Sequence, residues 1–251
     1  MTYLLVFFAA LQFLTRIPLN LPFLNGRITG EIMAKSISCF PLVGLLMGCI
    51  VWAFFIIGNH LFNPWTAAAM IIAVQIILSG GLHIDGFMDT SDALFSHKSR
   101  HQMLEIMRDS RVGALGAASA IVLLLLKFSL LAQLTFEASF VILTSMLVLS
   151  RWTLVIAIVV FPYAREAGLG KAFQGNKGLS SFLVACLFTF FILLSLQTPY
   201  LFLVWLAVSI LTFLIGKWLS SLLGGLTGDT YGWLSEISEI ICLMLLIVYL
   251  V

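Results

Sequence analysis

Charged side chains are scarce in this chain of 251 residues. Lys and Arg number 13 and Asp and Glu number 11, so 10% of the residues are charged, against about 25% in an average soluble domain. Hydrophobic residues make up 61%, and the mean hydropathy is +1.13. These values exclude a soluble globular protein. With a net charge of +2 and no basic cluster, they also exclude nucleic acid as a partner.

Cysteine motifs for metal binding or redox chemistry are also missing. Cys39, Cys49, Cys186 and Cys242 lie in apolar segments, and no two of them form a CxxC pair. Structural zinc sites and dithiol redox sites use closely spaced cysteines. We therefore expect four unpaired cysteines that pack as small hydrophobic residues.

Long uncharged runs predict an all-α, polytopic membrane protein with about seven transmembrane helices. A helix needs about 20 apolar residues to cross the hydrocarbon core, and it satisfies its own backbone hydrogen bonds in lipid. The predicted spans are residues 37–57, 65–82, 113–134, 138–161, 181–196, 199–215 and 240–251. Residues 3–14 are short, so we expect a tilted or re-entrant helix there. Gly44 and Gly48 have the GxxxG spacing of closely packed helices.

Lys and Arg are absent from three predicted turns, which indicates an orientation. These turns are residues 58–64, 135–138 and 197–199, and they alternate with the connector 16–35 and the polar loops 83–112, 163–180 and 217–239. Positively charged loops stay in the cytoplasm. We therefore expect a multi-pass protein of the bacterial cytoplasmic (inner) membrane with the polar loops on the cytoplasmic side. No repeat or linker divides the chain, so residues 1–251 are interpreted as one domain whose polar loops form the active face.

Three aspartates dominate the first polar loop. Asp85, Asp89 and Asp92 follow one another at i, i+4 and i+7, so a helix would carry all three on one face. Carboxylates this close repel each other and raise one another's pKa. Since no Lys or Arg lies in residues 83–97, we favour a Mg²⁺ site over a solvated face. A zinc site is the weaker interpretation, because the loop's histidines share no spacing.

Two basic residues lie inside predicted spans. Arg151 is expected to pair with a loop carboxylate or a substrate phosphate, because ionisable groups at such depth usually face a polar interior. Lys127 lies nearer to the end of its span, and we expect it to reach the membrane surface along its flexible stem. Arg165 and Lys171 lie in a glycine-rich loop that either contacts phosphate or is an ordinary cytoplasmic loop.

A second group of acids lies near the C-terminus. Asp229, Glu236 and Glu239 either complete a second metal site or orient an attacking hydroxyl group, although Asp229 can equally cap a helix. In the first loop, Asp109 follows Arg108 and precedes Arg111, next to the start of the following span.

Six sequence blocks together resemble one known family. They are FLTRIP (13–18), FPLVG (40–44), GGLHIDGFMDTSDALF (80–95), EIMRDSRVGALG (105–116), PYAREAGLGKAF (162–173) and GGLTGDTYGWLSEISE (224–239). In this order they resemble the integral-membrane cobalamin synthases, the adenosylcobinamide-GDP ribazoletransferases. The departures at Met88, Ser91 and Ala93, where relatives commonly have Ala or Gly, leave every acidic position intact.

The resemblance implies a phosphoryl transfer. A ribose hydroxyl of α-ribazole or its 5′-phosphate attacks adenosylcobinamide-GDP, and GMP leaves. It implies Mg²⁺ as the cofactor, held by Asp85, Asp89 and Asp92. The remaining site residues that it suggests are Arg108, Arg111, Arg151, Arg165 and Lys171 for phosphate, with Asp109, Asp229, Glu236 and Glu239 for catalysis.

Other functions compete with this interpretation. CDP-alcohol phosphotransferases and membrane prenyltransferases also use aspartates at helical spacing, but the residues after Asp85-Gly86 depart from the first signature, and residues 229–239 are too rich in Glu for the second. A cation-coupled transporter predicts acids at mid-bilayer and a repeated half. The lipid bilayer is the expected partner in all cases, and a homo-oligomer is left open.

Overall fold

The chain folds as a bundle of α-helices. The computed structural model describes residues 2–18, 26–166, 168, 170, 171, 173 and 178–251. The helices are α1 (Thr2–Leu14), α2 (Gly30–Ser36), α3 (Phe40–Leu61), α4 (Pro64–Ser79), α5 (Leu82–Phe95), α6 (Arg100–Ile106), α7 (Ala114–Leu131), α8 (Phe136–Val160), α9 (Leu179–Ser195), α10 (Tyr200–Leu223) and α11 (Gly228–Leu250), with a 3₁₀ turn, η2 (Ile37–Cys39).

Local sequence signals mark where several helices begin. Thr29, Asn63, Thr135 and Thr227 each accept a hydrogen bond from the backbone N–H three residues later. These side chains satisfy donors that have no partner inside the helix. Pro64 stands at the first position of α4, where its missing N–H costs nothing.

Helix α8 forms the centre of the bundle. Its residues from Ile142 to Ile158 are all buried, and α3 packs directly against it. A Cβ at Gly44 would lie 2.6 Å from the carbonyl oxygen of Leu147, and one at Gly48 would lie 2.8 Å from the Cα of Thr144. The GxxxG pair therefore does bring two helix backbones together, as its spacing predicts.

The all-α membrane fold is confirmed, but the predicted count of seven spans is not. Within the described residues, five stretches are long and apolar enough to cross a membrane: Gly30–Leu61, α7, α8, α10 and α11. Helices α4 and α5 pass the same test only together, and they are bent by 91°, which gives at most six spans. The predicted span at 181–196 forms only a shorter apolar helix, and residues 3–14 form a short apolar helix as expected.

The predicted boundaries near the C-terminus are wrong. Residues 217–239 do not form a polar loop, because α10 continues to Leu223 and α11 begins at Gly228. The span predicted at 240–251 is therefore the second half of a helix of 23 residues. The polar side chains in the first half of α11 misled the prediction, since several of them face partners inside the bundle rather than water.

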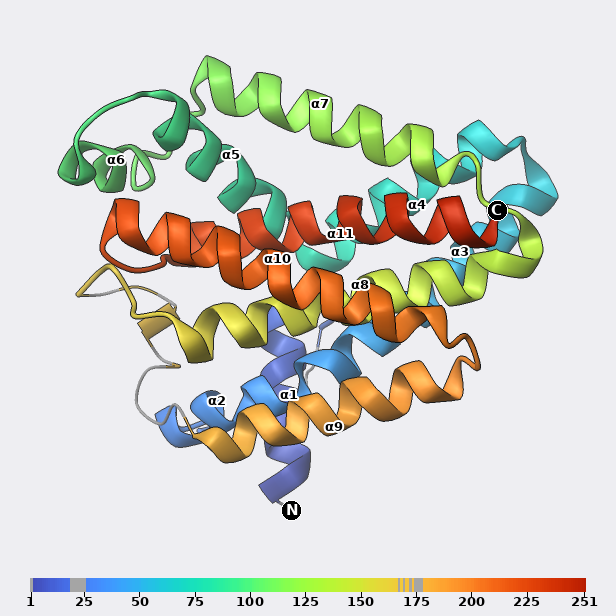
Figure 1. Cartoon of the computed structure of the whole chain (residues 1–251), viewed down its shortest axis with the longest axis horizontal. Helices are drawn as coiled ribbons and strands as arrows, with labels where there is room; N and C mark the ends of the chain where they lie inside the picture. Colours follow the sequence, from blue (N-terminus) through green and yellow to red (C-terminus); the bar gives the residue numbers. More distant parts are fainter. Residues whose placement is uncertain (1, 19–25, 167, 169, 172, 174–177) are drawn as a thin grey trace.

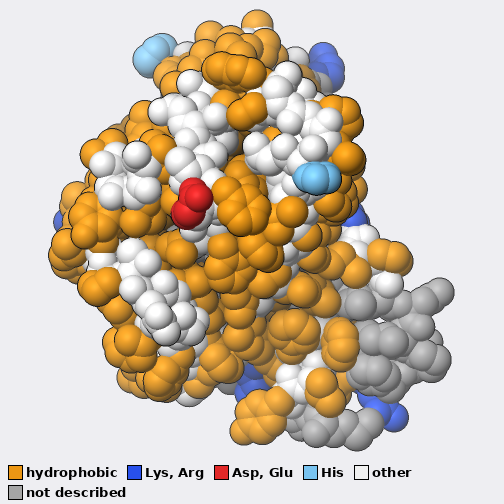
Figure 2. Space-filling model, turned by 90° about the vertical axis from the view of Figure 1, so that its right-hand side faces the viewer, with side chains coloured by type: hydrophobic (Ala, Val, Ile, Leu, Met, Phe, Trp, Pro, Cys, Tyr) orange, Lys and Arg blue, Asp and Glu red, His pale blue; other side chains and the backbone are white. Residues whose placement is uncertain are grey.

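The connections between the long helices gather at the two ends of the bundle (Figure 1). The turns before α4, α8 and α10 lie at the end that also holds the C-terminus. The α5–α6 segment, the C-terminal end of α8, the N-terminal end of α9 and the α10–α11 connection lie at the opposite end. Figure 2 views the first end, where hydrophobic side chains dominate and Lys and Arg appear only at the periphery. The polar segments are thus separated from the turns that lack basic residues.

Candidate active site

The aspartates that the sequence singles out lie on α5. This helix turns away from α4 at Gly80 and Gly81, which both have left-handed backbone conformations, with φ of 63° and 75°. Glycine adopts such angles without the steric cost of a Cβ. Asp85 is exposed, and Asp89 and Asp92 are half-buried. The bend therefore presents this acidic face outside the five long spans.

Helix α5 packs closely against the beginning of α11. A Cβ at Gly86 would lie 2.7 Å from the carbonyl oxygen of Asp229, and one at Gly232 would lie 2.8 Å from that of His83. Trp233 also donates a hydrogen bond of 3.2 Å to Ser91. These contacts bring Asp229, which is distant in sequence, next to the aspartates of α5.

Asp92 has a structural partner of its own. Its carboxylate oxygens accept hydrogen bonds from the backbone N–H groups of Gly113, at 2.8 Å, and Gly116, at 2.7 Å. These N–H groups belong to the first turn of α7, whose cap residue Gly113 has no side chain to bind them. Asp92 therefore caps α7 from another helix, a role that the sequence prediction missed.

Asp85 and Asp89 have no such partners. Among the described residues, neither carboxylate has a hydrogen bond or an ion pair. Burial, together with the negative charges of Asp85, Asp229 and Asp92, raises the pKa of Asp89 to about 7, and Arg165 opposes this rise. The repulsion expected between clustered carboxylates is thus present in the fold.

A cavity of about 190 Å³ lies beside Asp85 and is called the Asp85 cavity below. Arg165 binds Asp229 in it, with 2.7 Å between the guanidinium Nη2 and the carboxylate Oδ2. Its lining is Phe13, Leu82, His83, Asp85, Gly86, Leu154, Ile158, Tyr163, Arg165, Gly168, Gly170, Gly228, Asp229, Tyr231 and Gly232. It therefore combines acidic groups from α5 and α11 with apolar side chains from α8 and α1.

A wider groove of about 510 Å³ lies along the acidic face and is called the Asp89 groove below. It is lined by Asp89, Asp92, Asp109 and Arg111, among others. Arg111 binds Asp109 at 2.6 Å, and this hydrogen-bonded pair lowers the pKa of Asp109 to about 2. A carboxylate that holds protons so weakly is a poor general base, so a role as metal ligand suits Asp109 better.

Two other predicted phosphate ligands lie on the surface. Arg108 is exposed near Asp109, and exposed Lys171 donates a hydrogen bond to the backbone carbonyl of Glu166. Neither lines the Asp85 cavity or the Asp89 groove. Of the predicted basic ligands, only Arg165 lines the Asp85 cavity and only Arg111 lines the Asp89 groove.

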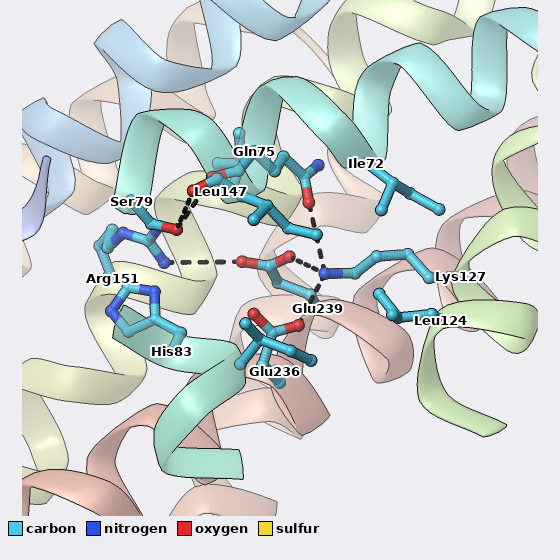
Figure 3. Close-up of a pocket in the computed structure, with 12 residues that line it drawn as sticks. Ile72, Gln75, Ser79, His83, Leu124, Lys127, Leu147, Arg151, Glu236 and Glu239 are labelled. Atoms are coloured by element: carbon cyan, nitrogen blue, oxygen red, sulfur yellow. Dashed lines mark hydrogen bonds and ion pairs between the residues drawn. The ribbon is translucent and has the colours of Figure 1, made fainter. Parts of the chain in front are cut away.

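The remaining predicted residues form a separate cluster inside the bundle (Figure 3). Lys127 binds Glu236 at 2.8 Å and Glu239 at 2.7 Å, and its side chain is only 3% exposed. Arg151 lies 3.5 Å from Glu239 and donates to the hydroxyl groups of Ser150 and Ser235. We call Lys127, Arg151, Glu236 and Glu239 the buried charge cluster. It contains two positive and two negative groups.

The buried charge cluster corrects one prediction and refines two others. Lys127 does not reach the membrane surface, because two buried carboxylates and Gln75 hold its amine inside the bundle. Arg151 does pair with a carboxylate, but that carboxylate belongs to α11 and not to a loop. Glu236 and Glu239 lie on a helix and away from the Asp85 cavity lining. The clue in the sequence was charge balance, since two basic and two acidic residues all lie in apolar surroundings.

The donor set at α5 fits a Mg²⁺ ion that a substrate helps to hold. Among the described residues, no three His, Cys, Asp or Glu side chains are arranged to hold a metal ion alone. Mg²⁺ commonly takes one or two carboxylates and completes its shell with water and substrate phosphates. The free carboxylates of Asp85 and Asp89 meet this need, and their mutual repulsion is what a cation relieves.

Known proteins share this sequence over nearly its whole length. Residues 6–247 match the family described as cobalamin-5-phosphate synthase (CobS). The adenosylcobinamide-GDP ribazoletransferase of Desulfitobacterium hafniense (strain Y51) is 42% identical, with 94% of this chain and 93% of the relative covered. The protein of the same name from Escherichia coli (strain K12) is 34% identical, with 96% and 99% covered. No solved structure matches the chain.

Proposed function

The chain belongs to the cobalamin-5-phosphate synthase family, and we propose that it joins α-ribazole or its 5′-phosphate to adenosylcobinamide-GDP with release of GMP. The bond that forms links a ribose oxygen to the corrinoid-side phosphorus. The bond that breaks joins this phosphorus to the bridging oxygen, which leaves with GMP. The proton of the ribose hydroxyl passes to a base or to water.

One observation carries this proposal. Asp85 lines the same cavity as the Arg165–Asp229 pair, and Asp89, one turn further along α5, lines the Asp89 groove. Phosphoryl transfer depends mainly on positioning and on neutralising charge. A site with unpaired carboxylates for a cation and a guanidinium for phosphate supplies both.

The residues have separate tasks in this mechanism. Asp85 and Asp89 would hold Mg²⁺, which neutralises the diphosphate and stabilises the leaving group when bound. Arg165 orients a phosphate oxygen through its guanidinium N–H groups, and Asp229 fixes the guanidinium in turn. Asp229 also lies beside the Asp85 cavity, where it can accept a hydrogen bond from the attacking hydroxyl. Asp92 keeps α7 in place beside the groove.

The location of the reaction is part of the proposal. We place the acidic end of the bundle on the cytoplasmic side of the bacterial inner membrane, since the charge pattern of the loops favours that side. Both substrates are polar, so they reach this end from the aqueous phase. The bilayer surrounds the apolar sides of α7 and α10, whose outward leucines are exposed.

The test is direct. Purified full-length protein in nanodiscs is supplied with adenosylcobinamide-GDP and α-ribazole, with Mg²⁺ or with EDTA. We expect GMP and cobalamin phosphodiester product in equal amounts with Mg²⁺, and neither with EDTA. A folded, Mg²⁺-replete sample that forms no product from these substrates contradicts the proposal and points to a different diphosphate.

A further inference from the structure

The Asp85 cavity contains polar groups that the fold leaves without partners. Tyr231 is 4% exposed, and its hydroxyl has no hydrogen-bond partner among the described residues. The Nε of Arg165 is likewise buried and unpaired in that part of the chain. Both residues line the cavity. Burial of a donor without a partner destabilises the fold, so this arrangement favours a ligand that supplies acceptors.

The opposite side of the cavity is apolar and partly aromatic. Leu154 and Ile158 of α8 are buried in it, and Phe13 of α1 and Tyr163 join them. The rings of Tyr163 and Tyr231 lie 6.4 Å apart between centroids and are inclined by 38° to each other. We call these two rings the aromatic wall. Flat aromatic ligands gain contact area and favourable ring–ring geometry from such a wall.

The size of the cavity limits what enters it. An apolar cavity of about 150 Å³ in another protein accommodates benzene, and this cavity measures about 190 Å³. A bicyclic aromatic base fits that space, whereas a corrin ring is far too large. The more open Asp89 groove, of about 510 Å³, is the better place for the larger substrate.

From these observations we infer that the Asp85 cavity is the subsite for the acceptor nucleoside. This inference rests on the proposed function and names the half of the site that each substrate takes. The planar base packs against the Leu154–Ile158 side and the aromatic wall. The ribose hydroxyls and ring nitrogen take the free donors of Tyr231 and Arg165. The sugar then faces Asp229 and the diphosphate, which is where the attacking oxygen must be.

A glycine at the edge of the cavity provides a steric test. Gly228 opens α11 and lines the cavity, and a Cβ there would meet no atom within 4 Å. The variant Gly228→Val therefore fills cavity space without a clash in the protein. Gly30 is a matched control, because it opens α2, also has no atom within 4 Å of a Cβ and lies outside the cavity.

Removal of one hydroxyl provides the chemical test. Tyr231→Phe keeps the ring and deletes the unpaired donor, while Tyr200→Phe makes the same change where Tyr200 stacks on Tyr249, away from the site. We expect Tyr231→Phe to raise the KM for α-ribazole about fivefold, the range expected for one hydrogen bond. The KM for adenosylcobinamide-GDP should stay within about twofold.

Binding and turnover are measured separately, so that the two proposals can fail independently. Equilibrium dialysis of α-ribazole against the full-length protein, without the second substrate, reports the subsite alone. We expect Gly228→Val to weaken this binding at least tenfold and Gly30→Val to leave it unchanged. Unchanged α-ribazole binding in both Gly228→Val and Tyr231→Phe overturns the subsite, even where wild-type turnover confirms the reaction. If the variants weaken α-ribazole binding as expected but the wild-type protein forms no product, the subsite is supported and the proposed reaction is contradicted.

Discussion

Helix α11 carries two groups of acids that the fold treats in opposite ways. Asp229, in its first turn, lies at the open end with Asp85 and Asp89, where three carboxylates face one guanidinium. Glu236 and Glu239, two to three turns further on, lie in the buried charge cluster, where two carboxylates face two cations. The first group has an excess of two negative charges, and the second has none.

This difference in charge balance indicates a difference in task. In a matched buried ion pair each charge is balanced inside the protein, so the pair calls for no cation from outside. A cluster with unpaired carboxylates is held at an energetic cost unless a cation binds. We therefore expect the acids of α5 and Asp229 to serve the reaction, and Glu236 and Glu239 to hold α7, α8 and α11 together.

The largest effect on activity is expected at Asp85. Asp85→Asn removes an exposed, unpaired carboxylate and should lower turnover at least about 100-fold, because a major source of charge stabilisation is lost. Expression and thermal stability in detergent should stay near those of the wild type, since this side chain has no partner among the residues that the structure describes. Steady-state GMP release measures turnover, and a melting curve measures stability. Full activity in this variant would show that Asp85 is not a metal ligand.

The next largest effect is expected at Lys127, and it is a loss of stability rather than of catalytic activity. Lys127→Met leaves Glu236 without a cation and should lower the free energy of unfolding by about 3–5 kcal/mol, the usual result when one partner of a buried pair is removed. The double variant Lys127→Met, Glu236→Gln restores charge balance and should recover most of this loss. Chemical denaturation in detergent micelles measures it, and a double variant no better than the single one would contradict the charge argument.

A smaller effect concerns how Mg²⁺ binding depends on pH. The pKa of Asp89 lies at about 7, so below this pH a Mg²⁺ ion must displace a proton from the carboxyl group to bind. The Mg²⁺ concentration for half-maximal activity should therefore fall about fivefold from pH 6 to pH 7, about tenfold in all by pH 8, and change little above that pH. Titrations of activity with Mg²⁺ at each pH measure this, with Asp89→Asn as the variant expected to lose the dependence.

The smallest effect is expected at Asp92 and separates capping from metal binding. Asn keeps one of the two oxygens that accept these N–H groups and Ala keeps neither, so Asp92→Ala should cost about 1 kcal/mol more stability than Asp92→Asn. If Asp92 serves mainly as the cap of α7, Asp92→Asn keeps most of the activity. If Asp92→Asn instead loses as much Mg²⁺ affinity as Asp89→Asn, Asp92 is a metal ligand as well.

Much of this protein follows from the sequence alone, because the relevant signals are local. The long apolar runs specify helices in a membrane, and the spacing of Gly44 and Gly48 specifies a close helix contact. The spacing of Asp85, Asp89 and Asp92 places three carboxylates on one helical face. Each of these depends on residues within a few turns of one another, so periodicity is enough to predict it.

The tertiary structure decided what those residues contact. Lys127 binds Glu236 and Glu239, which lie more than 100 residues away in the sequence. Only the packing of α7 on α11 shows that its amine is buried. Asp92 was predicted to bind metal like its neighbours, yet the start of α7 provides two backbone N–H groups for it. Periodicity gives the face on which a side chain lies, but the partner opposite that face is set by how distant helices pack.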